Sequence, residues 1–203
     1  MLIRRQQGVS LIEVIIGIAI LAMLMGLGVP QYAIFLANAR LKATTDTLVS
    51  GLSLARAEAV KRNARVEMVL TDEDPIEGLV NAVPASTNGI NWMVREFVPR
   101  TGTYNYIEGK VGAEGGGKQT GTTVGITSSS PGVYTGIVSF TGFGALASGS
   151  AITFQITNTT GGLCAAAGGP MRCLTVVVSA GGQIRTCDPA VNPITSPTDT
   201  RAC

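Results

Sequence analysis

Near the start of the chain stands the stretch Arg4-Arg5-Gln6-Gln7-Gly8-Val9-Ser10-Leu11-Ile12-Glu13-Val14, and an uncharged apolar run continues from it to Val29. The run has roughly the ~20 residues that a membrane-spanning helix needs. Glu13 is the one acidic residue in this stretch. A carboxylate in hydrocarbon costs about 2.5–3.5 kcal/mol on insertion scales. A chain that carries this cost is expected to use the charge.

Two ordinary kinds of segment share part of this pattern. A secretory signal peptide also has a basic start and an apolar core, but the core is usually shorter and a cleavage site of small residues lies at its far end. Gly26 and Gly28 could mimic such a site. A plain single-span anchor is the other alternative. Neither explains Glu13 or the junction between Gly8 and Val9.

The same stretch resembles the N-terminus of a type IV prepilin. In that family a dedicated peptidase cuts after the glycine, here Gly8, and the new first residue, here Val9, is N-methylated. The glutamate five residues into the mature chain, here Glu13, pairs with the terminal amine of a neighbouring subunit in a helical filament. The resemblance implies a chain that is held in the bacterial inner membrane by one span before it joins a pilus or pseudopilus filament.

The charge balance and the absence of histidine exclude several classes of function. The 203 residues include 15 basic and 13 acidic side chains, and removal of a leader with Arg4 and Arg5 makes the two numbers equal. A neutral chain offers no overall basic surface for nucleic acid. Without histidine, Ser-His or Cys-His catalysis and histidine-based metal sites are excluded. We therefore expect no enzyme activity, no cofactor and no metal.

All four cysteines lie in the last forty residues, at Cys164, Cys173, Cys187 and Cys203. They lack the paired C-x-x-C spacing of a zinc site, and an even number in an exported domain indicates two disulfides. Of the three possible pairings we favour Cys164–Cys173 and Cys187–Cys203, because each closes a short loop rich in glycine or proline. The domain would then lie in the oxidising periplasm, while the basic leader stays in the cytoplasm.

The sequence predicts an α+β fold in which a long N-terminal helix, membrane-spanning in its first half, packs on a C-terminal antiparallel β-sandwich-like domain. An apolar stripe (Ile34, Leu41, Leu48, Leu52, Ala55 and Ala59) indicates that the helix continues to about residue 63. We expect a leader at 1–8, a membrane and filament-core helix at 9–30, an amphipathic helix at 31–63 and a periplasmic β domain at 64–203. Expected strands are 66–70, 90–97, 122–127, 136–141, 151–157, 174–179 and a final hairpin arm at 183–186.

Several later stretches narrow the resemblance from type IV prepilins in general to one family among them. Leu52-Ser53-Leu54-Ala55-Arg56-Ala57-Glu58-Ala59-Val60-Lys61-Arg62-Asn63 closes the helix, and Ile90-Asn91-Trp92-Met93-Val94, Phe140-Thr141-Gly142-Phe143-Gly144 and Gly182-Gln183-Ile184-Arg185-Thr186-Cys187 follow in the β region. Together they resemble the GspH/FimT family of minor pilins and pseudopilins. The resemblance implies a β-sandwich packed on the C-terminal half of the helix.

Two loops carry patterns that suggest ligand binding. Residues 112–119 nearly spell a phosphate-binding loop, but Gln119 stands where a Ser or Thr would hold magnesium. Asp72-Glu73-Asp74 with Glu77 could gather oxygen ligands for calcium, but their spacing is not that of an EF-hand. A flexible loop and a solvated acidic loop are the favoured interpretations.

Three arginines, Arg172, Arg185 and Arg201, lie close to the cysteines in the sequence. In DNA-capturing members of the resembling family, a Gly-Arg-x-Arg element near the C-terminus contacts the DNA backbone. The matching stretch here is Gly182-Gln183-Ile184-Arg185, so the first arginine is missing. Useful affinity for phosphates at physiological salt needs several cations. Contact with nucleic acid is therefore possible but not favoured.

The interpretation that we favour is a minor pilin that helps to initiate or cap a type IV pilus. Its partners would be other minor and major pilins, the prepilin peptidase and the inner-membrane assembly platform. One alternative is the H-type pseudopilin of a type II secretion system, and another is a tip pilin that captures DNA for transformation. The shared helix encodes assembly, so the sequence does not separate these three.

Overall fold

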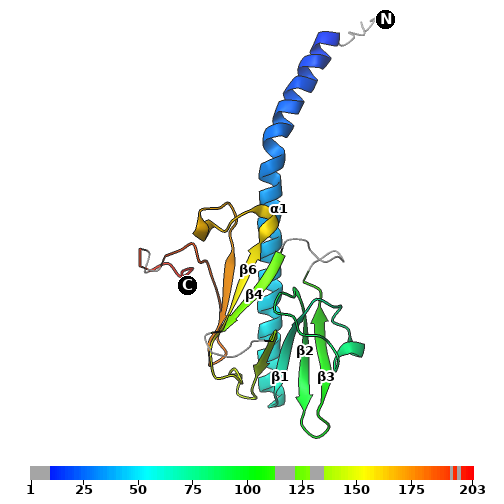
Figure 1. Ribbon diagram of the computed structural model, residues 1–203, viewed down its shortest axis with the longest axis vertical. Coiled ribbons are helices and arrows are strands. Elements are labelled where there is room, and N and C mark those ends of the chain that lie inside the picture. Colours follow the sequence, from blue (N-terminus) through cyan, green and yellow to red (C-terminus); the bar gives the residue numbers. More distant parts are fainter. Residues whose placement is uncertain (1–9, 113–121, 129–134, 193, 196–197) are drawn as a thin grey trace, which may run out of the picture. The chain divides into compact units, whose positions relative to one another are not determined.

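The computed structural model describes residues 10–112, 122–128, 135–192, 194–195 and 198–203. The chain forms two compact units, Met1–Leu36 and Ala37–Cys203. The first helix, α1 (Leu11–Arg62), contributes to both units (Figure 1). In the first unit, the described residues form the N-terminal part of α1. The second unit combines the remainder of α1 with two β-sheets.

Both sheets are antiparallel and four-stranded. Sheet A has the order β3-β2-β1-β5 and sheet B has the order β4-β6-β7-β8. The strands of sheet A are β1 (Val66–Thr71), β2 (Asn91–Val98), β3 (Thr103–Lys110) and β5 (Ile137–Phe140). Those of sheet B are β4 (Thr122–Ser128), β6 (Ile152–Asn158), β7 (Leu174–Val178) and β8 (Ile184–Cys187). Among the described residues, three 3-10 turns lie between strands: η1 (Glu77–Leu79), η2 (Thr159–Gly161) and η3 (Ala165–Ala167).

The end of α1 is fixed by a left-handed residue. Asn63 has a φ of 49°, a conformation that asparagine tolerates better than most residues. The N–H of Ala64 donates to the carbonyl oxygen of Ala59 at 3.1 Å, and the N–H of Asn63 donates to that of Val60 at 3.2 Å. This pair of bonds is a Schellman motif, which ends the helix and turns the chain directly into β1.

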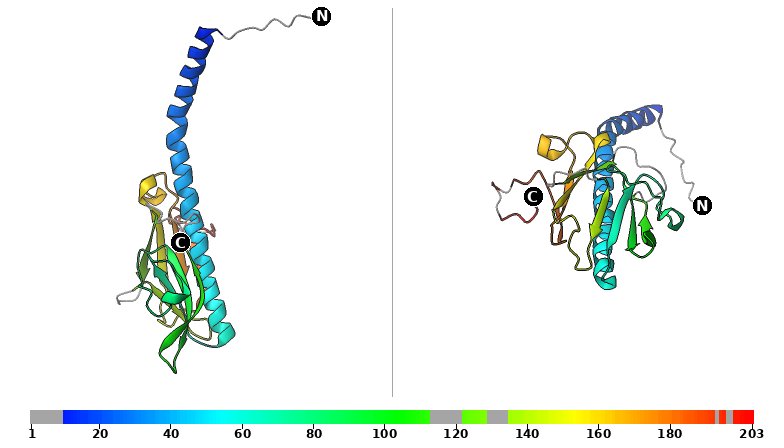
Figure 2. Two further views of the ribbon diagram at one scale, coloured as in Figure 1. Left: turned by 90° about the vertical axis from the view of Figure 1, so that its right-hand side faces the viewer. Right: turned by 60° about the horizontal axis from the view of Figure 1, so that its bottom comes forward.

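The core of the second unit lies between α1 and the inner faces of the two sheets. The predicted stripe is buried at Leu41, Leu48, Leu52, Ala55 and Ala59. Burial alternates along β6, where Phe154 and Ile156 are buried. All six residues of β1 are buried, because Val69 packs into a second cluster with Val80, Val83 and Met93. Figure 2 shows the two sheets and this part of α1 from two further directions. The fold class predicted from the sequence is confirmed.

Gly51 sets how closely α1 approaches sheet A. A Cβ at this position would lie 2.8 Å from two ring atoms of Trp92 and 3.1 Å from the Cε methyl of Met68. Trp92 is the only tryptophan of the chain and is 2% exposed. The missing side chain therefore makes the space in which the indole ring lies flat against the helix.

One strand, β3, was not predicted from the sequence. Its Tyr104 and Tyr106 are half-buried and alternate with polar residues, because β3 is the outer edge of sheet A. Gly109 and Lys110 form the end of β3. A Cβ on Gly109 would collide with the carbonyl oxygen of Pro75. The glycine marks a close approach of a second segment to the strand and not the beginning of a turn.

We predict that Leu52→Ala lowers the free energy of unfolding by about 2–5 kcal/mol, because it opens a cavity at the centre of the buried stripe. Leu52 is 0% exposed, whereas its neighbour Ser53 is exposed. Ser53→Ala is the control and should change the stability by less than about 0.5 kcal/mol. Denaturant unfolding followed by the fluorescence of Trp92 measures both. Equal effects of the two variants would contradict the packing described.

Candidate functional site

The N-terminal half of α1 is apolar on all sides. Every side chain from Ser10 to Gly26 is exposed, and Glu13 is the only charged residue among them. The exposed fractions of the large apolar side chains between residues 11 and 25 run from 50% at Val14 to 77% at Leu11. An 18-residue window has a mean hydropathy of 2.5 and no buried part, so the helix can cross a membrane by length and composition. Soluble monomers rarely expose such a surface.

Glu13 lies in the first turn of this helix. Its N–H donates to the carbonyl oxygen of Ser10 at 3.0 Å, so Ser10, the residue before α1, accepts the first hydrogen bond of the helix. The first turn carries partial positive charge from N–H groups without partners, and this favours a carboxylate there. The predicted cleavage and methylation positions, Gly8 and Val9, lie outside the described residues.

Three stretches that are distant in the sequence meet near the C-terminal end of α1. Arg56 donates from Nε to the carbonyl oxygen of Gly144 at 3.2 Å. A Cβ on Gly144 would lie 2.9 Å from the Cγ2 atom of Val60, and one on Gly182 would collide with the carbonyl oxygen of Gly144. The stretches 52–63, 140–144 and 182–187, three of the four later stretches that carry the family resemblance, therefore form one structural cluster. All three stretches are distinctive in the sequence, but their proximity depends on the tertiary fold and was not predicted.

An open groove lies on the solvent side of this cluster. It is lined by Arg56, Ala57, Val60 and Lys61 of α1 together with Gln183 and Ile184 of the β7–β8 hairpin. Val60 is 52% exposed, and Phe143, next to Gly144 in the chain, is 91% exposed. Apolar side chains of Ala57, Val60 and Ile184 in an open groove make a candidate contact surface. We call it the helix-end groove.

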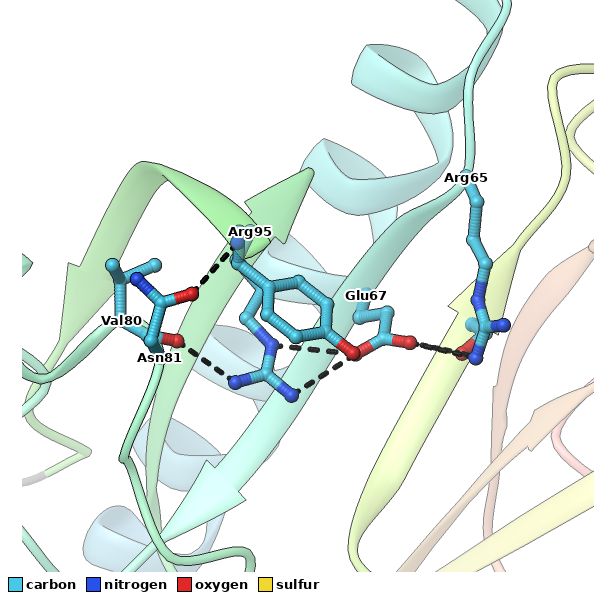
Figure 3. Close-up of polar contacts among 7 residues, drawn as sticks. Arg65, Glu67, Val80, Asn81 and Arg95 are labelled. Atoms are coloured by element: carbon cyan, nitrogen blue, oxygen red, sulfur yellow. Dashed lines mark hydrogen bonds and ion pairs between the residues drawn. The ribbon is translucent and has the colours of Figure 1, made fainter. Parts of the chain in front are cut away.

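A buried ion pair crosses sheet A on the face away from α1 (Figure 3). Glu67 and Arg95 are opposite each other in the β1–β2 register, and their exposed fractions are 1% and 6%. Both Nε and Nη2 of Arg95 donate to Oε2 of Glu67, at 3.3 and 3.1 Å. Nη1 of Arg95 donates to the carbonyl oxygen of Val80 at 2.8 Å, and its guanidinium lies 3.6 Å from the ring centre of Tyr104.

The second carboxylate oxygen of Glu67 is also satisfied. Arg65 approaches Oε1 at 2.7 Å, and the Ser139 hydroxyl donates to the same atom at 3.3 Å. A buried charge whose hydrogen bonds are all made is stable, whereas removal of one partner leaves the other uncompensated. This network fastens the segment before β2 to the sheet. The sequence held a signal for it, since two opposite charges fall within strands otherwise rich in apolar residues.

The structure contains the two disulfides that the sequence analysis favours, Cys164–Cys173 and Cys187–Cys203, and each closes a short loop. The first closes the loop that holds η3. The second joins the end of β8 to the last residue, and Asp188 forms an isolated bridge with Ala202 beside it. The C-terminal segment is thereby tied back to sheet B.

The three candidate arginines lie on different segments. Arg172 precedes β7 and is attached to α1 through its backbone N–H, which donates to Oδ1 of Asn38 at 2.8 Å. Arg185 lies in β8 opposite Val177. Arg201 forms an ion pair with Asp199 at 2.7 Å, and this hydrogen-bonded contact lowers the pKa of Asp199 to about 2. Arg201 is thus engaged with Asp199 in an exposed ion pair, and the three arginines lie on three separate segments of the chain.

The loop patterns give no ligand site in the part of the chain that the structure describes. Asp72, Glu73, Asp74 and Glu77 are all exposed, and no group of acidic or cysteine side chains there is arranged to hold a metal ion. Most of the glycine-rich segment 112–119 lies outside the described residues.

Comparison with known families agrees with these features. Residues 3–29 match the prokaryotic N-terminal methylation motif. Residues 44–182, more than half of the chain, match the type II transport protein GspH. The chain belongs to the GspH family. The family resemblance inferred from the sequence is thus confirmed, and membership makes this chain a minor pilin or pseudopilin.

Solved structures were also found for comparison with this GspH-family chain. The type IV minor pilin FimU of Pseudomonas aeruginosa is 17% identical over 74% of this chain and 90% of FimU, with a TM-score of 0.48. The minor pseudopilin EpsH of the Vibrio cholerae type 2 secretion system is 11% identical over 76% of this chain and 99% of EpsH, with a TM-score of 0.46. No curated protein matches the sequence significantly.

We predict that Gly182→Ala destabilises the GspH-family domain by more than about 1 kcal/mol, because its φ of 81° is strained for alanine and a Cβ would meet the Gly144 carbonyl. Gly181 is the matched control, since a Cβ there would have only the Ser179 hydroxyl at 4.0 Å. Gly181→Ala should leave the stability within about 0.5 kcal/mol. Thermal unfolding of both variants tests the close approach, and an unstable Gly181→Ala beside a stable Gly182→Ala would refute it.

We predict that Arg95→Met costs about 3–5 kcal/mol of unfolding free energy, because it leaves Glu67 buried without its main partner. Arg100 is exposed at the β2–β3 turn, so Arg100→Met should cost less than about 0.5 kcal/mol. Urea denaturation at neutral pH compares the two. A loss below about 1 kcal/mol in Arg95→Met would show that Arg65 and Ser139 alone suffice for Glu67.

Proposed function

We propose that this chain is a filament subunit that waits in the inner membrane and then packs through α1 into a helical bundle of neighbouring subunits. The observation that carries the proposal is the apolar N-terminal half of α1, exposed on every side with Glu13 as its single charge. Lipid covers this surface before assembly, and the helices of other subunits cover it afterwards. The match of residues 3–29 to the N-terminal methylation motif supports the same sequence of events.

Maturation begins at the Gly8–Val9 junction in this proposal. The prepilin peptidase removes residues 1–8 and leaves Val9 as an N-methylated first residue. The positive leader stays in the cytoplasm, so the β domain is in the periplasm, where its two disulfides form. The mature chain then has the arrangement expected from the sequence: core helix 9–30, amphipathic helix 31–63 and β domain 64–203.

Glu13 selects the assembled state over the isolated one. A lone carboxylate in hydrocarbon is unfavourable, whereas a carboxylate matched to a neighbouring amine recovers much of its desolvation cost. Val9 precedes Glu13 by only four residues in the chain, so in this proposal its amine is close to the membrane depth of Glu13. A small axial offset between two subunits therefore brings the amine of one to the carboxylate of the other.

Within a type IV pilus, we place the chain in the initiating or tip complex with other minor pilins, above the major pilins and the assembly platform. The GspH family of minor components supports this position. The second candidate is the H-type pseudopilin of a type II secretion system, which is favoured by the description of the matching family as a type II transport protein. A deletion strain scored for twitching and for exoprotein secretion separates the two, and its transformation frequency tests the capture of DNA.

We predict that Glu13→Val enters the membrane and is processed at Gly8 as well as the wild type, yet falls at least about tenfold in sheared filaments, a loss that corresponds to about 1.4 kcal/mol. The reason is that the variant inserts more easily but has no partner for the neighbouring amine. Ile15→Val, a conservative change in the same part of α1, is the control and should assemble normally. Immunoblots of membrane and sheared fractions from a complemented deletion strain give the answer. Filaments with wild-type amounts of Glu13→Val would rule out the pairing role.

A further inference from the structure

The loop of residues 161–171 is exposed to solvent and yet carries no charged, amide or hydroxyl side chain. It consists of glycine, leucine, cysteine, alanine, proline and methionine only. Leu163 is 68% exposed, and the three alanines that follow Cys164 are exposed as well. Loops on the surface of soluble domains usually include polar turn residues. We call this segment the apolar loop, and its composition indicates that something other than water covers it.

The apolar loop has a defined backbone. The disulfide Cys164–Cys173 closes it at its base. The N–H of Ala165 donates to the carbonyl oxygen of Met171 at 2.6 Å, and the N–H of Met171 donates to that of Leu163 at 3.1 Å. Because these bonds fix the chain, Leu163 points away from the core while Met171 is 0% exposed. A preformed loop loses little conformational entropy when another surface receives it.

The apolar loop is fastened to α1 at Ala37 and Asn38, the first residues of the second unit. Oδ1 of Asn38 accepts the backbone N–H of Arg172 at 2.8 Å, and Nδ2 of Asn38 donates to the carbonyl oxygen of Pro170 at 3.5 Å. A Cβ on Gly161 would lie 3.0 Å from the Cβ of Ala37. Figure 1 shows this yellow-orange loop beside α1, at the end of the β domain where α1 enters it.

The attachment point follows the membrane-spanning stretch directly in the sequence. No charged residue occurs between Glu13 and Arg40, and Asn38 is only two residues before Arg40. In the first unit, Tyr32 is 66% exposed. Tyrosine is enriched where a spanning helix crosses from lipid to water. The chain itself therefore keeps the attachment point of the apolar loop within a few residues of the lipid.

Three cations belong to the same attachment point. Arg40 and Lys42 follow Asn38 by two and four residues on α1, and Arg172 is the residue bonded to it. All three cationic side chains are exposed, and none of them forms an ion pair among the described residues. Cations near an anionic membrane are attracted to its headgroups, and the long stems of Lys and Arg let the charge reach them.

The small size of the apolar loop favours lipid over a protein partner. A stable protein interface buries about 800 Å² on each side. One leucine, three alanines and a proline offer much less than that. A small apolar tip with cations beside it instead suits the boundary between headgroups and acyl chains. The tip needs little affinity of its own there, because the spanning helix already holds it close to the membrane.

We propose that the apolar loop lies on the periplasmic leaflet of the inner membrane. Leu163 enters the upper acyl chains, and Arg40, Lys42 and Arg172 contact anionic phospholipid headgroups. The inference rests on the proposed function in one respect, namely that the chain waits in the inner membrane before assembly. The contact holds the β domain against the bilayer in that state, and it breaks when α1 leaves the lipid for the filament.

The test uses the full chain in vesicles of phosphatidylcholine and phosphatidylglycerol whose acyl chains carry bromine close to the headgroups. Bromine quenches tryptophan fluorescence on contact, and Trp92 is 2% exposed, so the wild type gives the background. Leu163→Trp adds an emission that we expect brominated lipid to reduce at least about twofold. Thr101→Trp, exposed at the β2–β3 turn, is the control and should keep its emission.

Charge neutralisation tests the part that the headgroups play. Arg40→Gln, Lys42→Gln and Arg172→Gln together should weaken the lipid quenching of Leu163→Trp at least about fivefold, and phosphatidylcholine alone should do the same. Arg100→Gln, a neutralisation at the β2–β3 turn, should leave the quenching unchanged.

Hydrogen exchange of the wild type is the second measurement, because tryptophan itself favours the membrane interface. The amides of residues 163–170 should exchange at least about fivefold more slowly in vesicles with phosphatidylglycerol than in phosphatidylcholine alone, while those of 99–102 stay unchanged.

Equal quenching at positions 163 and 101, no quenching at 163, or no effect of the cations would each overturn the proposal. An emission at 163 that lipid does not quench, but that shifts to the blue when other pilins are present, would assign the apolar loop to a protein partner and also overturn it. Failure of the lipid contact while the wild type still enters sheared filaments overturns this contact alone. A lipid contact in a chain that never enters filaments refutes the filament function instead.

Discussion

The exposed apolar surface between Ser10 and Gly26 is the constraint on which the rest of this molecule depends. A helix that is apolar all round has no stable place in water, and the described residues show no part of the chain covering it. Other material must therefore cover it: lipid first and, in the proposed function, neighbouring helices later. Glu13 gives this surface a preference between the two environments, because a carboxylate is tolerated poorly by lipid and well by a matched amine.

The C-terminal half of the same helix is amphipathic. Its buried apolar stripe packs against both sheets. Glycines at three points allow the approach: Gly51 beneath Trp92, and Gly144 and Gly182 where two turns meet beside Arg56. The cluster at Arg56 brings together three stretches that are far apart in the sequence and on which the family resemblance is partly based. These stretches form a single contact at the end of α1. Arg56 of the helix meets Gly144 and Gly182, two glycines with positive φ that lie in turns next to the two sheets.

Much of this could be predicted from the sequence because periodicity and composition act locally. Local patterns predict the helix and its end near Asn63. They also predict seven of the eight described strands and the favoured disulfide pairs. The edge strand β3 was missed because half its residues face solvent and carry little apolar signal. The Glu67–Arg95 pair and the helix-end groove were missed because they depend on register and on tertiary proximity. The roles of Gly8, Val9 and Glu13 remain predictions that the family resemblance and the helix support.

The central claim is that one helix meets two kinds of surroundings, and spin labels along α1 test it most directly. Single cysteines are introduced at successive positions from 14 to 24 and from 41 to 59 in the full chain in membranes, and each label's collision rate with oxygen and with a water-soluble nickel complex is measured. The account predicts high oxygen and low nickel accessibility at every position of the first range, whatever the helix face. In the second range it predicts that the collision rates vary with a period of 3.6 residues. Both rates should be lowest at Leu41, Leu48, Leu52, Ala55 and Ala59. The same period in the first range, or nickel access throughout it, would contradict the claim.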